Sequence, residues 1–163
     1  MTDNLGAAEY VAALVSDSAA GLQAFLPCII FLIAIGLSFA TGTSWGTFGI
    51  LIPIVVNCFQ NTDYTMMIIA ISACMAGAVC GDHCSPISDT TIMSSAGAEC
   101  EHINHVSTQL PYAFTVAAVS FVTYIVAGLT KSAWISLPVG IVLMTLVLVV
   151  IKVMSDKKEA KTE

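Results

Sequence analysis

Four stretches of this 163-residue chain contain no Asp, Glu, Lys or Arg, and they limit its fold more than any other feature: residues 18–62, 64–81, 102–130 and 132–151. A helix that crosses the hydrocarbon core of a bilayer needs about 20 largely apolar residues. Several of the stretches are long enough. We therefore predict an all-α integral membrane protein whose immediate partner is the lipid bilayer.

The composition excludes other classes of protein. Hydrophobic residues make up 57 % of the chain and charged residues 10 %, with a mean hydropathy of +0.90, whereas about a quarter of the residues of a soluble domain are charged. The chain has five Lys, no Arg and a net charge of −6, so we expect no nucleic-acid partner, because binding nucleic acid needs a basic surface. The chain has no P-loop and no legible nucleophile–base constellation. We expect neither enzyme activity nor a cofactor.

The first third of the chain predicts an interfacial segment followed by a re-entrant helical hairpin. Residues 1–21 place apolar side chains at roughly helical spacing, as in a helix lying at the membrane surface, or form a leader without a role. Residues 22–60 are apolar except for a small, polar tip at 41–47. Each arm of 12–16 residues reaches about 18–24 Å, short of a core about 30 Å thick. Two full spans remain an alternative, because residues 22–40 number 19.

The rest of the chain predicts a broken helix and two ordinary spans. Residues 64–98 form an apolar segment whose break, at 81–89, contains Pro86, which cannot continue a helix. A polar loop over 99–105 then leads to spans at 107–130 and 132–152. The tail, 153–163, follows Lys152 and is rich in Lys. The positive-inside rule places the tail in the cytoplasm.

Two carboxylates lie inside the otherwise apolar segment 64–98. Asp82 and Asp89 flank the break, and an ionisable residue at membrane depth is a functional-site hypothesis by default. Freed carbonyls, carboxylates and the hydroxyls of Ser85, Ser88 and Thr90 would offer the oxygen ligands that hard cations prefer. A carboxyl group removed from water favours its protonated form. A proton and Na⁺ would therefore compete for one site.

Each of these residues also has a plainer interpretation. Asp89 is a candidate helix N-cap, and Asp82 is a candidate buried polar residue with an unseen partner. His83 is either a proton relay with Asp82 or a hydrogen-bonded structural histidine. Two Cys/His groups, around Cys80 and Cys100, match no strong zinc pattern, so we expect no transition-metal site.

The hairpin tip adds hydroxyl groups to this picture. Thr43 and Ser44 offer hydroxyls beside Gly42 and Gly46, and broken elements of this kind meet at transporter substrate sites. A plain turn with hydroxyl caps is the alternative. We expect backbone breaks at four positions: Gly42, Gly46, Gly81 and Pro86.

Two stretches resemble the NhaC-type Na⁺/H⁺ antiporter family: GTSWGTFGILIPI at 42–54 and GDHCSPISDTTIMSSAGAECEHINHVSTQLPYA at 81–113. The resemblance covers residues 25–113 and implies the C-terminal half of such a protein, in the cytoplasmic membrane of a prokaryote. It implies one repeat of an inverted-repeat secondary transporter, in which a hairpin tip and a broken helix meet around the ion. The ion-binding residues it implies are Thr43, Ser44, Asp82, Ser85, Ser88 and Asp89.

The chain departs from the family in its length. Members of the family are about two to three times longer, so this chain offers one repeat where alternating access needs one bundle to move against another. We expect Na⁺/H⁺ antiport by a partial or split transporter, completed by a matching N-terminal half or by a homo-oligomer. The alternatives are a Na⁺/H⁺-coupled exchanger of organic acids or amino acids, and a non-transporting remnant or regulatory subunit.

Overall fold

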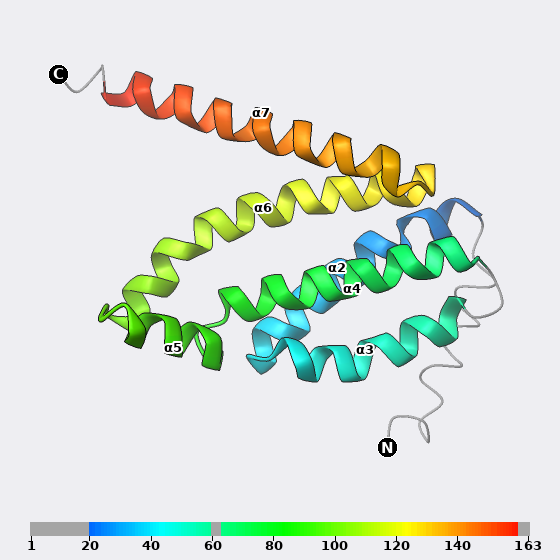
Figure 1. Ribbon diagram of the computed structural model, residues 1–163, viewed down its shortest axis with the longest axis horizontal. Coiled ribbons are helices and arrows are strands. Elements are labelled where there is room, and N and C mark those ends of the chain that lie inside the picture. Colours follow the sequence, from blue (N-terminus) through cyan, green and yellow to red (C-terminus); the bar gives the residue numbers. More distant parts are fainter. Residues whose placement is uncertain (1–19, 60–62, 160–163) are drawn as a thin grey trace.

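The computed structural model describes residues 20–59 and 63–159, and the secondary structure of this part of the chain consists of helices joined by short turns. The all-α fold expected from the apolar stretches is confirmed. The helices follow one another as an up-and-down bundle (Figure 1), and the interfacial segment expected over 1–21 lies almost wholly outside the described residues. Their bounds are α2 Ala20–Thr41, α3 Ser44–Phe59, α4 Tyr64–Cys84, α5 Asp89–Gly97, α6 His102–Thr130 and α7 Ala133–Glu159.

α2 and α3 form the hairpin, and its turn is shorter than the sequence predicted. Only Gly42 and Thr43 separate the two helices, so Gly46 lies in the first turn of α3 and not in a break. Gly42 has φ +69°, a left-handed conformation that glycine adopts without steric cost, and its N–H bonds to the Ser38 carbonyl at 2.8 Å. With 22 residues, α2 is about 33 Å long and α3, with 16, about 24 Å.

α4 packs closely along α2 because small residues line their contact. A Cβ on Gly77 or Gly81 would collide with the α2 carbonyls of Phe31 and Ile35, respectively. The Ser38 hydroxyl donates across the contact to the Ala78 carbonyl at 2.6 Å. Gly81 is therefore a close-packing residue inside α4, not part of a break, and this contact holds the end of α4 against the hairpin tip.

The break in the second segment is confined to the four residues between α4 and α5. α4 runs three residues past the onset expected at 81, and Pro86 lies in the break, as expected. α5 ends in a hydrogen-bonded turn: the Glu99 and Cys100 N–H groups bond to the Ala96 and Ser95 carbonyls at 3.1 Å each. α6 then begins at His102, so the expected loop over 99–105 is largely helical.

Four of these helices are long and apolar enough to cross a membrane: α2, α4, α6 and α7. α7 contacts mainly α6 and is exposed over most of its surface (Figure 1). It continues through the expected tail to Glu159. The expected end of the span at residue 152 marks where the apolar sequence stops. The helix itself runs further, because polar residues can also form the backbone hydrogen bonds of a helix.

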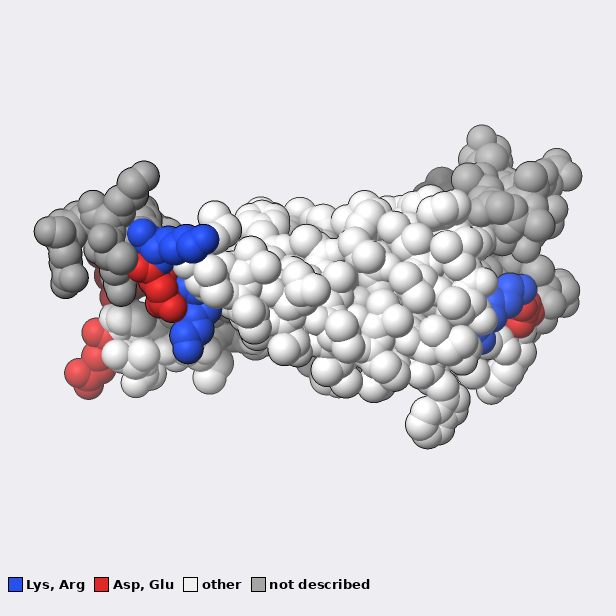
Figure 2. Space-filling model, turned by 90° about the horizontal axis from the view of Figure 1, so that it is seen from above, with Lys and Arg blue, Asp and Glu red and all other residues white. Residues whose placement is uncertain are grey.

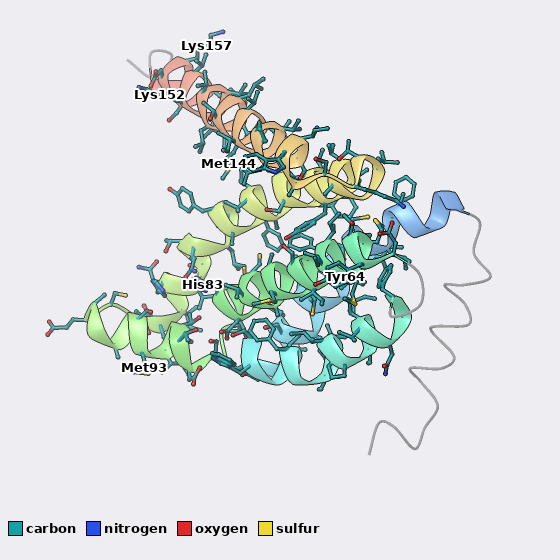
Figure 3. All side chains as sticks on the ribbon, turned by 45° about the vertical axis from the view of Figure 1, so that its right-hand side comes forward. Tyr64, His83, Met93, Met144, Lys152 and Lys157 are labelled. Atoms are coloured by element: carbon teal, nitrogen blue, oxygen red, sulfur yellow. The ribbon has the colours of Figure 1, made fainter. Side chains whose placement is uncertain are left out.

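On the face of the bundle shown in Figure 2, the Lys, Asp and Glu side chains lie at the two ends, and the surface between them shows none. At one end, Lys131 pairs with Asp63 at 2.7 Å. At the other end lie the α5–α6 connection, with Glu99 and Glu101, and the end of α7, with Lys152 and Lys157 (Figure 3). This distribution agrees with a membrane-spanning orientation of the bundle.

Candidate functional site

The Asp82 carboxylate lies at the junction of the hairpin and the broken helix. It is carried by the last turn of α4 and is 6 % exposed. Ser44 Oγ, at the start of α3, donates to Asp82 Oδ2 at 3.1 Å, and Ser88 Oγ, at the end of the break, donates to Oδ1 at 2.6 Å. Two segments that are distant in the sequence, the start of α3 and the end of α4 with the break that follows it, thus converge on one carboxyl group.

The hairpin tip and the break also touch through their backbones. A Cβ on Gly42 would lie 2.9 Å from the Ile87 carbonyl oxygen. Ser85 Oγ donates to the Phe39 carbonyl at 2.8 Å and accepts from the Ile87 N–H at 3.3 Å. Ser85 and Ser88 are fully buried. The two irregular segments singled out in the sequence therefore lie side by side.

The structure does not bring every expected residue to Asp82. Asp89 is exposed at the first residue of α5, and its Oδ1 accepts from the Thr90 N–H at 2.9 Å. Ser88, rather than Asp89, occupies the N-cap position of α5. Thr43 Oγ1 accepts from the Gly46 N–H at 3.4 Å, as a cap of α3. Among the described residues, no hydrogen bond joins Asp89 or Thr43 to the Asp82 carboxylate.

His102 holds the break in place, and sequence reasoning gave it no such role. Its Nε2 lies 2.6 Å from the Pro86 carbonyl oxygen, and its Nδ1 lies 3.1 Å from Ser95 Oγ. A carbonyl only accepts, so Nε2 carries the proton in this contact. His102 begins α6, sixteen residues after Pro86. Only the tertiary fold brings the two together, so no local motif could have found this contact.

Asp82 has no countercharge in the part of the chain that the structure describes. The ion pair found there joins Lys131 to Asp63, at the far end of α4. Hydroxyl donors stabilise a carboxylate, but a buried negative charge without a partner remains costly. A proton or a monovalent cation would neutralise it. Within residues 20–59 and 63–159, no group of three His, Cys, Asp or Glu side chains could hold a metal ion.

A family model described as the Na⁺/H⁺ antiporter family matches residues 2–129. The chain belongs to this family. The Na⁺/H⁺ antiporter family expected from the stretches at 42–54 and 81–113 is confirmed, and the NhaC type stays a prediction. The match covers both irregular segments and the whole neighbourhood of Asp82, so the convergence just described lies inside the antiporter-family region of the chain.

Curated relatives of this antiporter-family chain are much longer than the chain itself. A Haemophilus influenzae protein of uncharacterised function is 53 % identical over 124 residues, which are 76 % of this chain and 24 % of that protein. An uncharacterised Na⁺/H⁺ antiporter of H. influenzae is 38 % identical over 112 residues, 64 % of this chain and 24 % of the relative. A Bacillus subtilis malate-2H⁺/Na⁺-lactate antiporter is 30 % identical over 92 residues, 56 % of this chain and 19 % of the relative.

The matched region thus spans about a quarter of these relatives. No solved structure matches the chain.

Proposed function

We propose that this chain forms part of a secondary transporter that exchanges Na⁺ for H⁺, and that Asp82 is the group for which the two ions compete. The family is one of transporters, and one relative carries Na⁺/H⁺ antiporter in its name. Four apolar helices support an integral membrane protein. The inner membrane and a cytoplasmic C-terminus belong to the proposal.

The observation that carries the proposal is the buried Asp82 carboxylate, which has a serine hydroxyl on each of its oxygens and no countercharge within residues 20–59 and 63–159. A protonated Asp82 needs no countercharge. A bound Na⁺ supplies one, and the Asp82, Ser44 and Ser88 oxygens are ligands of the kind that hard cations prefer. Either ion satisfies the carboxylate and excludes the other, which is the thermodynamic requirement for exchange.

The remaining expected ligands have supporting parts in this proposal. Ser85 holds the break to the Phe39 carbonyl, so it fixes the backbone next to Asp82. Asp89 and Thr43 stay predictions as ion ligands, because neither bonds to Asp82 among the described residues. Asp89, exposed at the start of α5, would raise the local concentration of cations near the site.

We also propose that a further chain segment completes the transporter. The matched region is about a quarter of the length of its relatives, and alternating access requires one bundle to move against another. The completing part is either a matching N-terminal part of the transporter or a second copy of this chain. A test therefore uses two preparations in parallel: the chain reconstituted by itself, and the chain reconstituted together with its completing part.

The experiment compares Asp82→Asn with the wild-type assembly in vesicles that carry a pH-sensitive dye. We expect Na⁺-dependent proton movement in the wild type and its loss in Asp82→Asn, because the amide neither binds a proton nor neutralises Na⁺. Asp63→Asn is the matched control, since Asp63 lies at the other end of α4 and the amide oxygen can still cap the helix. Unchanged exchange in Asp82→Asn would remove this residue from the mechanism.

A second candidate function couples the same ions to an organic anion. The observation that favours it is the similarity to the malate-2H⁺/Na⁺-lactate antiporter of B. subtilis. Uptake of labelled lactate and malate by the same vesicles, with and without a Na⁺ gradient, separates the candidates. Na⁺-dependent uptake supports the coupled exchanger, whereas proton movement without uptake of either anion supports simple Na⁺/H⁺ antiport.

A further inference from the structure

Asp82 is the inner end of a chain of hydrogen-bonded hydroxyl groups. Ser88 Oγ lies 2.6 Å from Asp82 Oδ1, and Thr90 Oγ1 lies 2.7 Å from Ser88 Oγ. Asp82 and Ser88 are buried, whereas Thr90, on the first turn of α5, is exposed. This row of hydrogen bonds therefore leads from the interior of the bundle to its surface through three residues.

The number of available protons fixes the direction of these hydrogen bonds. An ionised carboxylate only accepts, so the single hydroxyl proton of Ser88 points to Asp82. Ser88 then has no proton left for Thr90, and the Thr90 hydroxyl must donate to Ser88. Both hydroxyls consequently point towards Asp82, which is the arrangement that delivers a proton to an ionised carboxylate.

The outer end of the chain opens into a polar pocket of about 240 Å³. Its lining comes from α4, α5 and α6 and is formed by six polar residues: His83, Thr90, Thr91, Ser94, His105 and Gln109. His83 lies near the end of α4, next to α6 (Figure 3). The titratable groups that face the pocket are His83 from α4 and His105 from α6, with Asp89 adjacent to Thr90 on α5.

We propose that Ser88 and Thr90 form the proton path between Asp82 and this pocket, which serves as a water-filled vestibule. The inference rests on the proposed function of Asp82 and specifies its proton route. A hydronium ion in the vestibule gives a proton to Thr90 Oγ1, the Thr90 proton moves to Ser88 Oγ, and the Ser88 proton moves to Asp82 Oδ1. Each hydroxyl gains one proton and loses one, and Asp82 becomes neutral.

The path uses only one oxygen of the carboxylate. Oδ1 faces Ser88 and the vestibule, whereas Oδ2 faces Ser44 at the hairpin tip. Thr90 touches Ser88 but makes no hydrogen bond to Asp82 in the described part of the chain. Its hydroxyl can therefore be removed without taking a ligand away from the proposed Na⁺ site, which makes the path separable from the ion pocket.

The test is Thr90→Val in the complete assembly, with Thr90→Ser as the variant that restores the hydroxyl. We expect Thr90→Val to slow Na⁺-dependent proton movement by at least about tenfold, which is a part of the roughly 10²–10⁴-fold that a positioned proton-transfer group contributes. The KM for Na⁺ should stay within about twofold, and Thr90→Ser should recover most of the rate. Thr115→Val is the control, because the Thr115 hydroxyl bonds to its own helix, at the Pro111 carbonyl, and to no other segment that the structure describes.

Three results would overturn the path. Wild-type exchange in Thr90→Val would show that the hydroxyl is unnecessary, and an equal loss in Thr90→Ser would show that the hydroxyl is not what matters. A raised KM for Na⁺ at an unchanged maximal rate would make Thr90 a Na⁺ ligand instead. Should Thr90→Val fail to insert, Thr90→Ala removes the same hydroxyl. Exchange that survives Asp82→Asn would overturn the proposed function itself, a distinct outcome.

Discussion

Gly42 lies against the backbone of Ile87, and this contact joins the hairpin tip to the break of the second helix. A Cβ at position 42 would lie 2.9 Å from the Ile87 carbonyl oxygen and 3.0 Å from its carbonyl carbon. The residue also has φ +69°. Space and backbone conformation therefore both require glycine here, and the geometry around Asp82 depends on this approach.

We predict that Gly42→Ala destabilises the protein and weakens transport. The left-handed backbone should cost about 1–2 kcal/mol and displacement of Ile87 a further about 1–3 kcal/mol. The measurement is the thermal unfolding midpoint in detergent, together with the KM for Na⁺, which should rise as Ser44 moves away from Asp82. Gly36→Ala is the control, because no atom of the described residues lies within 4 Å of the added Cβ in α2 and alanine favours a helix. Equal midpoints for the two variants would contradict the contact.

We predict that His102 positions the break and that its Nε2–H is the group that matters. His102→Phe keeps a ring of similar size but loses the donor to the Pro86 carbonyl, 2.6 Å away. Its KM for Na⁺ should rise several-fold, because Ser88 would no longer be held at Asp82. His102→Gln retains a donor at about the same reach and should recover most of the affinity. If His102 served only the stability of the fold, both variants would lose the same amount of stability and the KM for Na⁺ would stay unchanged.

The sequence could predict the irregular segments but not every partner within them. Charge-free stretches located the helices, and Pro86 and the glycine-rich tip located the two interruptions, because these residues act locally on the backbone. The sequence placed Gly81 and Gly46 in breaks, but both lie inside helices. Glycine can interrupt a helix or allow two helices to pack closely, and the sequence does not distinguish these roles. Only the α2 carbonyl beside Gly81 shows that this glycine allows close packing. The Asp82–Ser44 and His102–Pro86 contacts join distant segments and required the tertiary structure.

The end of α5 offers a stabilising substitution. Glu99 has φ 50°, in the left-handed region, while the Cys100 N–H bonds back to the Ser95 carbonyl at 3.1 Å. Glycine is favoured at this position after a helix. We predict that Glu99→Gly raises the free energy of unfolding by about 1 kcal/mol, measured by thermal unfolding in detergent. Glu101→Gly, at a position with φ −62°, should show no such gain, and a gain of equal size there would contradict the backbone argument.

The Lys131–Asp63 pair predicts a pH-dependent contribution to stability. The hydrogen bond from Lys131 holds the pKa of Asp63 below its ordinary value, with backbone bonds from the start of α4 adding to the effect. A carboxylate with a lowered pKa stabilises the fold at neutral pH and loses this effect as the pH falls through its folded-state pKa. Both side chains are partly exposed, so the contribution is small.

We therefore predict that Lys131→Met lowers the unfolding midpoint slightly at pH 7, and that its difference from the wild type shrinks below about pH 4, the range in which Asp carboxyl groups take up protons. Asp63→Asn should behave in the same way, because the amide oxygen can still accept from the Thr65 N–H. Lys152→Met is the control, since Lys152 forms no ion pair in the described part of the chain. A difference between Lys131→Met and the wild type that persists unchanged into acid would show that packing, rather than charge, is what Lys131 contributes at this end of the bundle.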